Sequence, residues 1–309
     1  MQMKRPFAFA RAPQSMMLIP LAPVLAVQAW RTVRRTPRLD PAGGDEHGFV
    51  PGANPGTGRP AFRVVVIGES TAVGVGASRH AEALPGFLAE ALRDRLRRSV
   101  AWSVSGENGA TARRITAGLI PAAGGPGPDL GPDLVVVTTG INDLIRRRPP
   151  RRWAADVTGL VGAVRERYPD ASVLVAGMPP VHRFPALPQP LRYVLGARAR
   201  TMDRITRDAA RAGGAVHAPM DEAMARDRAL FASDGFHPSP AGYRAWAHDL
   251  ARAAAPTAAP PTVPPAVPPG MPNAMPKAVP PAAGPPPVRA RPAESTSTPP
   301  AGTAPPRKN

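Results

Sequence analysis

The sequence predicts an α/β fold in which helices cover both faces of a parallel sheet. Two features support this. Short runs of apolar residues alternate with longer stretches in which apolar residues recur at helical spacing. The short runs are apolar almost throughout, as in VVVIG at residues 64–68, which indicates strands buried on both faces. Strands of this kind, separated by helices, are typical of parallel sheets with right-handed crossovers.

The predicted elements alternate along the middle of the chain. The apolar runs predict strands at 62–68, 100–106, 133–140, 171–179 and 215–220. The helical spacing predicts helices at 82–98, around 111–119, and at 151–168, 191–213 and 239–254. We expect Ser239 to cap the last helix, with Pro240 at its first position, because these residue types favour those places.

The two ends of the chain differ from this middle part in composition. Residues 1–60 are interpreted as an N-terminal apolar segment followed by a linker, because residues 40–60 are rich in Gly, Pro and Asp. Residues 61–254 form the predicted domain. Residues 255–309 are rich in Pro and Ala with few large apolar side chains, so we expect a disordered tail.

The apolar stretch at residues 16–30 leaves three interpretations open. As a helix it would reach roughly 22 Å, less than the ~30 Å of a bilayer core. It is a candidate for a segment at a membrane surface or packed on the domain, for a signal peptide, or for a spanning anchor. The basic run RTVRR that follows opposes export. The location of the protein, cytoplasmic, membrane-associated or secreted, therefore stays open.

The composition excludes several classes of site and partner. The chain has no cysteine, which excludes disulfides, thiolate zinc sites and a cysteine nucleophile. The formal charge of +17 comes mainly from arginines spread along the chain, with no helix-turn-helix, zinc-finger or aromatic stacking pattern. We therefore expect no nucleic-acid partner, and instead a solvated basic surface or attraction to an anionic membrane.

Polar residues follow the predicted strands at their carboxyl ends, where parallel sheets bind ligands. The first three loops read GESTAVG with Ser70, GENGAT with Gly109, and TGINDL with Asn142. A later loop, DGFHP, adds Asp234 and His237. These residue types make up the set that a Ser/His/Asp hydrolase requires.

A nucleotide-binding loop explains the first of these loops poorly. GESTAVGVGA lacks the Lys of a Walker loop and the spacing of a G-x-G-x-x-G fingerprint. A simple corner between strand and helix would account for Gly68 but not for the other three loops. The interpretation as a nucleophile turn accounts for all four.

The four blocks together resemble those of the SGNH (GDSL-type) hydrolase superfamily, bacterial esterase/lipase-like branch. The matching blocks are Gly68-Glu69-Ser70, Gly109, Gly140-Ile141-Asn142-Asp143 and Asp234-x-x-His237, within a resemblance that covers about 62–254. Glu69 departs from the family motif, which has Asp there. The resemblance implies a three-layer αβα sandwich with a flavodoxin-like, five-stranded parallel sheet.

The resemblance also implies hydrolysis of carboxylic esters, small or lipid-derived, through an acyl-serine intermediate, with no metal or other cofactor. Ser70 would be the nucleophile and needs a base, because an unactivated hydroxyl is a poor nucleophile. His237 is the candidate base and Asp234 would orient its ring. His182, in the loop after the fourth strand, is the alternative base.

The resemblance further supplies an oxyanion hole made of the Ser70 amide, the Gly109 amide and the Asn142 side chain. Each such donor contributes roughly 3–4 kcal/mol to the stabilisation of the tetrahedral intermediate. A side chain at Gly109 would crowd the substrate, whereas Asp143 is expected to brace its loop.

The loop MPPVHRFPALPQPL at 178–191 is expected to border the substrate pocket, since it follows the fourth strand. Its apolar residues are candidates for holding an acyl chain, or alternatively for a small core under the loop. They are Met178, Val181, Phe184, Leu187 and Leu191.

Two other functions compete with the esterase interpretation. One is a non-catalytic interaction protein on a hydrolase fold, tethered to a membrane by the N-terminal segment. The other is an acyltransferase or sugar deacetylase of the same superfamily. The complete set of Ser, Gly, Asn, Asp and His favours an enzyme.

Overall fold

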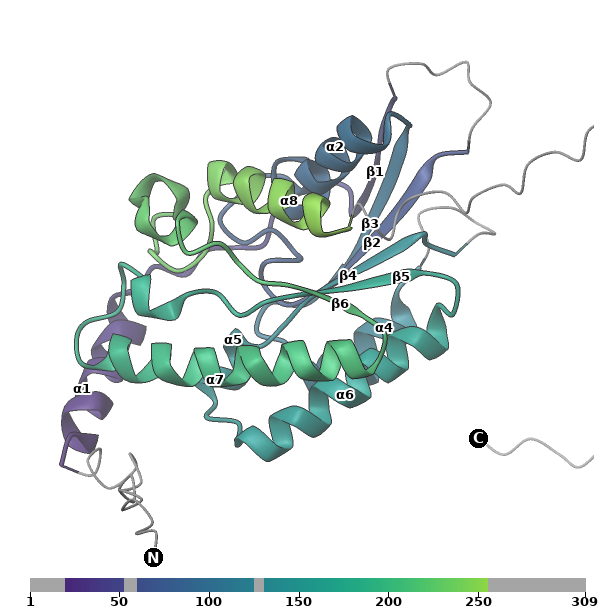
Figure 1. Ribbon diagram of the computed structural model, residues 1–309. Coiled ribbons are helices and arrows are strands. Elements are labelled where there is room, and N and C mark those ends of the chain that lie inside the picture. Colours follow the sequence, from purple (N-terminus) through teal and green to yellow (C-terminus); the bar gives the residue numbers. More distant parts are fainter. Residues whose placement is uncertain (1–19, 53–59, 125–130, 255–309) are drawn as a thin grey trace, which may run out of the picture. The chain divides into compact units, whose positions relative to one another are not determined.

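A six-stranded sheet forms the centre of the computed structural model, which describes residues 20–52, 60–124 and 131–254 (Figure 1). The strand order is β1-β3-β2-β4-β5-β6. The strands are β1 (His47–Val50), β2 (Phe62–Gly68), β3 (Val100–Gly106), β4 (Leu134–Thr138), β5 (Ser172–Ala176) and β6 (Val216–Ala218). The strands β2 to β6 pair in parallel, as the sequence predicts.

The sixth strand corrects the predicted count of five and the linker assigned to residues 40–60. β1 pairs antiparallel with β3, with His47 opposite Ser103 and Val50 opposite Val100. Its four residues alternate between exposed and half-buried, so it lacks the continuous apolar run of the central strands. A short edge strand of this kind gives little sequence signal, because its stability comes from backbone pairing with a neighbour.

Helices cover both faces of the sheet, which confirms the layered α/β fold (Figure 1). One layer contains α2 (Leu84–Leu96) and α8 (Pro240–Ala254), and the other contains α6 (Pro150–Arg167) and α7 (Leu191–Ala212). Shorter helical segments connect the strands on the second side. They are α3 (Ala112–Arg114), a π-helical turn at Ile115–Leu119, α4 (Ile120–Ala122) and α5 (Ile141–Ile145).

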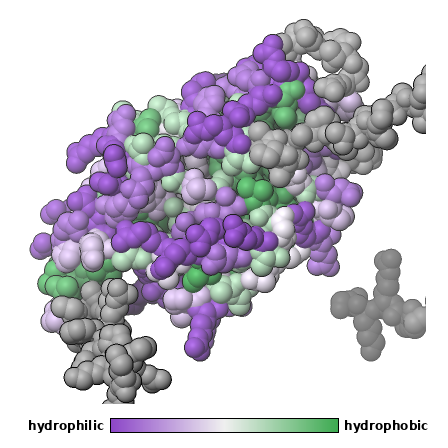
Figure 2. Space-filling model, viewed as in Figure 1, coloured by the Kyte–Doolittle hydropathy of each residue, from purple (hydrophilic) through white to green (hydrophobic). Residues whose placement is uncertain are grey.

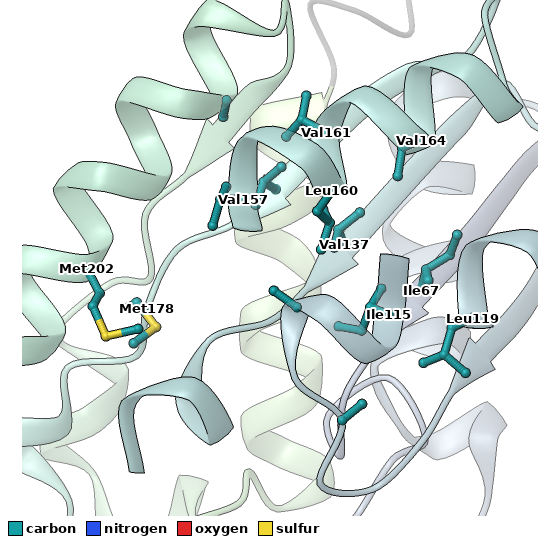
Figure 3. Packing of buried hydrophobic residues seen from close by; sticks show 14 of the residues in the cluster. Ile67, Ile115, Leu119, Val137, Val157, Leu160, Val161, Val164, Met178 and Met202 are labelled. Atoms are coloured by element: carbon teal, nitrogen blue, oxygen red, sulfur yellow. The ribbon is translucent and has the colours of Figure 1, made fainter. Parts of the chain in front are cut away.

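Alternation along the strands divides the core into two clusters. In β2, Val64 and Val66 pack in the cluster with α2 and α8, whereas Val65 and Ile67 pack in the cluster with α6 and α7. Figure 3 shows Ile67 and Val137 in this second cluster together with side chains of α6. Both faces of each central strand are therefore buried, which explains the apolar runs in the sequence.

One helix, α1 (Ala22–Arg35), precedes the sheet and contains part of the apolar stretch at 16–30. The Gln28 side chain fastens it, because its Nε2 donates to Gln189 O and its Oε1 accepts from Leu191 N. Among the described residues, no helix combines the length and the apolar character needed to cross a membrane. Residues 16–19 and the predicted tail at 255–309 lie outside the described residues.

The start of α8 shows how the sequence positions the last loop. Ser239 Oγ accepts a hydrogen bond from Gly242 N, and Pro240 is the first residue of the helix, as expected. The helix also carries Tyr243, whose buried hydroxyl donates to Val75 O in the loop that follows Ser70. The helix cap and this hydrogen bond hold the first and last loops against each other.

Candidate active site

Three predicted site residues form one chain of hydrogen bonds. His237 Nε2 lies 3.0 Å from Ser70 Oγ, and His237 Nδ1 lies 2.5 Å from Asp234 Oδ2. Ser70 stands directly after β2, whereas Asp234 and His237 come from the loop before α8. The geometry suits proton transfer from the serine hydroxyl to the imidazole, with the carboxylate orienting the ring.

The Asp234 carboxylate is held by the backbone of its own turn. Its Oδ1 accepts from Phe236 N at 2.9 Å and from His237 N at 3.0 Å. Burial raises the pKa of this carboxyl, but the hydrogen bonds from the His237 ring and the two backbone groups outweigh burial and lower the pKa overall. Asp234 is therefore an anion at neutral pH and can stabilise a protonated imidazole.

Gly76 permits the close approach of the serine loop to the histidine loop. A Cβ at Gly76 would lie 2.5 Å from Pro238 O and 3.4 Å from His237 Cβ, and the residue has a φ of 100°. Backbone and side-chain contacts both exclude a larger residue here. The third glycine of GESTAVGVGA thus serves the contact between two loops rather than a phosphate.

Asn142 lies at the start of α5 and lines the same cavity as Ser70. Its Nδ2 donates to Glu69 Oε2 at 2.7 Å and to Ala110 O at 3.0 Å. Asp143 braces this region as expected, because its Oδ2 accepts from Ala112 N at 2.9 Å. The loops after β2, β3 and β4 are therefore linked through side chains of α5.

Gly109 has a φ of 85°, and a Cβ built there meets nothing within 4 Å. The protein itself thus favours glycine through backbone conformation rather than through crowding. Among the described residues, the backbone N–H groups of Ser70 and Gly109 have no hydrogen-bond partner. Ser70 lines the cavity described below, whereas Gly109 does not and its neighbour Asn108 does.

In the sequence, Glu69 is only a departure from the family motif, whereas in the structure its carboxyl connects the loop after β2 to the start of α5. Its side chain is buried, and its oxygens accept from Asn142 Nδ2 and from the backbone N–H groups of Ile141 and Asn142. Burial is the largest cause that raises the pKa of Glu69 to about 7, although these hydrogen bonds lower it. The nucleophile is thus flanked by a carboxyl that is partly protonated at neutral pH.

A cavity of about 540 Å³ contains Ser70, Asn142, Asp234 and His237. Its wall is mainly apolar and comes from segments far apart in the sequence. The apolar lining residues include Val33, Leu39, Ile141, Ile145, Phe184, Met220, Met224, Leu230, Phe231, Phe236 and Trp246. Cavities of several hundred Å³ with an apolar wall and few polar groups are typical of small-molecule sites.

The predicted acyl-binding residues require a correction. Only Phe184 lines this cavity, where its ring meets those of Phe231 and Phe236 edge-on. The other four are buried in the core cluster of α6 and α7: Met178, Val181, Leu187 and Leu191. Figure 3 shows Met178 near Met202 in that cluster. The loop folds back onto the start of α7, so its apolar side chains complete the core.

The alternative base, His182, lies away from Ser70. Its Nε2 is 3.6 Å from Glu222 Oε1, and it lines a different groove, on the side of α7. His217, in β6, lies 2.9 Å from Asp203 and is nearly buried. Of these histidines, His237 alone lines the cavity with Ser70.

Two groups of cavity residues are not among those that the sequence motifs predict. Met220, Met224 and Phe231 follow β6, so the rule that ligands bind after strands could have found them. The segment 32–39 also lines the cavity, and no local signal indicates this. The described residues include no group of three or more His, Asp or Glu side chains suited to hold a metal ion.

A family model and a known protein match this chain in sequence. The model of the GDSL-like lipase/acylhydrolase family matches residues 66–245. A GDSL-like esterase of Mycobacterium tuberculosis is 32% identical over 193 residues, which are 60% of this chain and 59% of the relative. The matched part thus spans less than two thirds of that relative's length.

A solved structure, that of TesA, is similar in fold. The two structures share 19% sequence identity at a TM-score of 0.50, over 63% of this chain and 98% of TesA. At this identity the likeness concerns the fold alone. It agrees with the three-layer arrangement described above.

Proposed function

The chain belongs to the GDSL-like lipase/acylhydrolase family, and from that premise we propose that it is a serine ester hydrolase that works through an acyl-serine intermediate. The observation that carries the proposal is the hydrogen-bonded series Ser70–His237–Asp234 inside a largely apolar cavity. The family membership agrees with the resemblance noted in the sequence. The roles of the individual residues are part of the proposal.

In the first half of the reaction Ser70 Oγ attacks the ester carbonyl carbon while its proton passes to His237 Nε2. Asp234 keeps the ring in the required tautomer and stabilises the imidazolium cation that forms. When the tetrahedral intermediate collapses, the bond between carbonyl carbon and alkoxy oxygen breaks. The imidazolium gives its proton to this oxygen, so that a neutral alcohol leaves and the acyl group stays on Ser70.

In the second half a water molecule gives a proton to His237 and attacks the acyl carbon. The bond to Ser70 Oγ then breaks and Oγ regains the proton, which releases the carboxylic acid. Each half passes through an oxyanion. The free N–H groups of Ser70 and Gly109 are two of its donors, and Asn142 Nδ2 is the third, turning from Ala110 O towards the oxyanion.

The apolar lining of the cavity favours substrates that have an apolar acyl group. The ring of Phe184 contacts those of Phe231 and Phe236 in the same cavity as the catalytic residues, and the wall is mainly apolar. Burying methylene groups there stabilises the complex by about 0.8 kcal/mol each. Small esters and lipid-derived acyl esters are therefore the proposed substrates, and initial rates from acetate to palmitate esters would establish the chain length.

The replacement Ser70→Ala tests the function. We expect it to abolish both the hydrolysis of p-nitrophenyl acetate and covalent labelling by a fluorophosphonate probe, with the circular dichroism spectrum unchanged. Ser78→Ala is the matched control, because Ser78 belongs to the same loop but does not line the cavity. Normal labelling of Ser70→Ala would overturn the assignment, and a wild-type protein that neither labels nor hydrolyses esters would favour a non-catalytic role.

We propose no nucleic-acid partner. We do propose that the protein contacts a membrane surface through residues 16–30. Within α1, the side chains of Val24, Val27 and Trp30 are exposed. Figure 2 shows apolar residues gathered where α1 lies, at the left of the view. Exposed apolar residues next to arginines suit an anionic lipid surface.

Co-sedimentation with vesicles that contain phosphatidylglycerol tests this contact. We expect the full chain to bind these vesicles and Trp30→Glu to bind them more weakly. Phe49→Glu, which changes an exposed aromatic residue on β1, is the control. Equal binding by both variants would contradict membrane contact through α1.

A further inference from the structure

The segment Thr32–Leu39, here called the strap, lies outside the part of the chain that matches the family model. Six of its residues nevertheless line the cavity that contains Ser70 and His237: Thr32, Val33, Thr36, Pro37, Arg38 and Leu39. The strap begins in the last turn of α1 and continues beyond the end of that helix. One wall of the cavity therefore comes from a segment with no counterpart in the family motifs.

The strap is fastened on both sides, so it acts as a fixed wall rather than a loose end. On the side of α1, Gln28 forms two hydrogen bonds with the backbone at the start of α7. On the other side, Leu39 packs against the core and Ala42 N donates to Val73 O at 2.9 Å. Between these points, Thr36 closes the helix, because its N–H and its hydroxyl both donate to Thr32 O.

The inner side of the strap combines apolar and cationic chemistry. Leu39 is half-buried in the cavity wall, whereas Val33 lines the cavity at an exposed position. Ile141 and Ile145 line the cavity from α5. Arg38 is the only arginine or lysine that lines the cavity within the described residues, and it forms no ion pair among them. The strap thus presents one cation beside an apolar wall.

The acidic groups in the cavity do not neutralise Arg38. Asp234 is bound to His237 and to two backbone N–H groups, and Glu69 is bound to Asn142 and to the start of α5. Arg38 is exposed, so its unpaired guanidinium group lies at the open side of the cavity, where its charge favours an anionic ligand group. A carboxylate, sulfate or phosphate on the substrate provides such a group.

We propose that the strap determines substrate selection: Arg38 binds an anionic group of the ester, while the apolar part of the same molecule lies against the wall that includes Leu39. The preferred substrate is then an anionic amphiphilic ester rather than a neutral one. This inference rests on the proposed function, since it concerns the same cavity and the same reaction.

The role of the Arg38 charge is tested with two p-nitrophenyl esters of similar length. One is the neutral butyrate, and the other is the hydrogen succinate, which carries a carboxylate. In Arg38→Gln the ratio of KM for the succinate to KM for the butyrate should rise about tenfold, because a charge-assisted contact is lost. Arg34→Gln is the control: Arg34 stacks on Trp30 at 4.6 Å and does not line the cavity, so the ratio should stay as in the wild type. An unchanged ratio in Arg38→Gln would overturn the proposal.

A bulky side chain in the strap tests whether this wall selects the acyl chain. Thr36→Trp places a large ring in the cavity, so the ratio of kcat/KM for a decanoate ester to that for acetate should fall about tenfold. Arg35→Trp changes the neighbouring residue, which does not line the cavity, and should leave this ratio as in the wild type. An equal fall in both variants, or none in Thr36→Trp, would show that the strap does not select the acyl chain.

The outcomes separate this inference from the proposed function. If Ser70→Ala still labels, the function itself fails and the strap experiments lose their basis. If the enzyme hydrolyses esters through Ser70 and both ratios stay constant, the function stands and the strap has no role in selection.

Discussion

At the scale of single residues, Glu69 places a buried carboxyl directly before the nucleophile. Burial raises its pKa from 4.5 to about 7, so the folded protein holds a proton there more tightly than the unfolded chain does. Between these two pH values the unfolded state binds fewer protons than the native state. The free energy of unfolding must therefore fall as the pH rises through this window.

The replacement Glu69→Gln removes this dependence, because an amide does not titrate. Relative to the wild type, the free energy of unfolding of Glu69→Gln should rise by up to about 3 kcal/mol between pH 4.5 and pH 8, at 1.36 kcal/mol per pKa unit. Urea unfolding at both pH values measures this difference. Glu82→Gln, at an exposed carboxyl, is the control, and a constant difference for Glu69→Gln would contradict the raised pKa.

The hydrogen bonds around His237 predict an order of damage among three replacements. His237→Ala should lower kcat by about 10⁶-fold, as Ser70→Ala does, because nucleophile and base act as one unit. Asp234→Ala should be milder, about 10⁴-fold, because this carboxylate orients the ring and supports its charge without reacting.

The third replacement, His182→Ala, should leave kcat close to that of the wild type, because His182 lines a different groove from Ser70. Steady-state kinetics with p-nitrophenyl acetate, together with fluorophosphonate labelling, measures all three. An inactive His182→Ala beside an active His237→Ala would show that the base is not His237 and comes from the loop after β5.

At the scale of elements, β1 is the strand that the sequence does not reveal. Gly48 lies opposite Trp102 in β3, and a Cβ at Gly48 would stand 2.5 Å from the indole ring. The ring of Trp102 thus occupies the space beside the β1 backbone. β1 and the residues just before it also connect the strap to the sheet, so the position of the cavity wall depends on this pairing.

The replacement Gly48→Val should destabilise the protein by about 1–3 kcal/mol, because its side chain overlaps Trp102. Phe49→Ser changes the next residue of the strand, whose side chain is exposed, and should cost about 0.5 kcal/mol or less. Urea unfolding compares the two variants. Equal stabilities would mean that β1 does not pack on β3 in this register.

At the scale of the whole molecule, the site is assembled from loops at one edge of the sheet and from the strap. Within the part of the chain that the structure describes, His and acidic side chains do not gather into a group suited to a metal ion. The residues of the catalytic series bind one another instead: His237 uses both ring nitrogens, one for Asp234 and one for Ser70.

Treatment with EDTA should therefore leave ester hydrolysis unchanged, since the proposed reaction needs only groups of the protein. The rate of p-nitrophenyl acetate hydrolysis before and after dialysis against EDTA measures this. A metal-dependent hydrolase of known behaviour, treated in parallel, shows that the chelation works. A large loss of activity that zinc or manganese restores would overturn the metal-free mechanism.

Local sequence patterns predict the central strands, the main helices and the residues that meet in the hydrogen-bonded series. Strands buried on both faces and amphipathic helices leave local patterns, and a parallel sheet brings the loops after its strands to one edge. Ser70, Asn142, Asp234 and His237 could thus be expected to meet although they are far apart in the chain. Their catalytic roles remain predictions.

Long-range contacts in the fold determine which apolar side chains face the cavity and which pack only in the core. Met178 and Phe184 belong to the same loop and pack in the same core cluster, yet only Phe184 also lines the cavity that contains Ser70. Local periodicity distinguishes buried from exposed positions but not one buried environment from another. The same reason applies to the strap and to β1: their positions depend on contacts with distant segments, which leave no repeating pattern in their own residues.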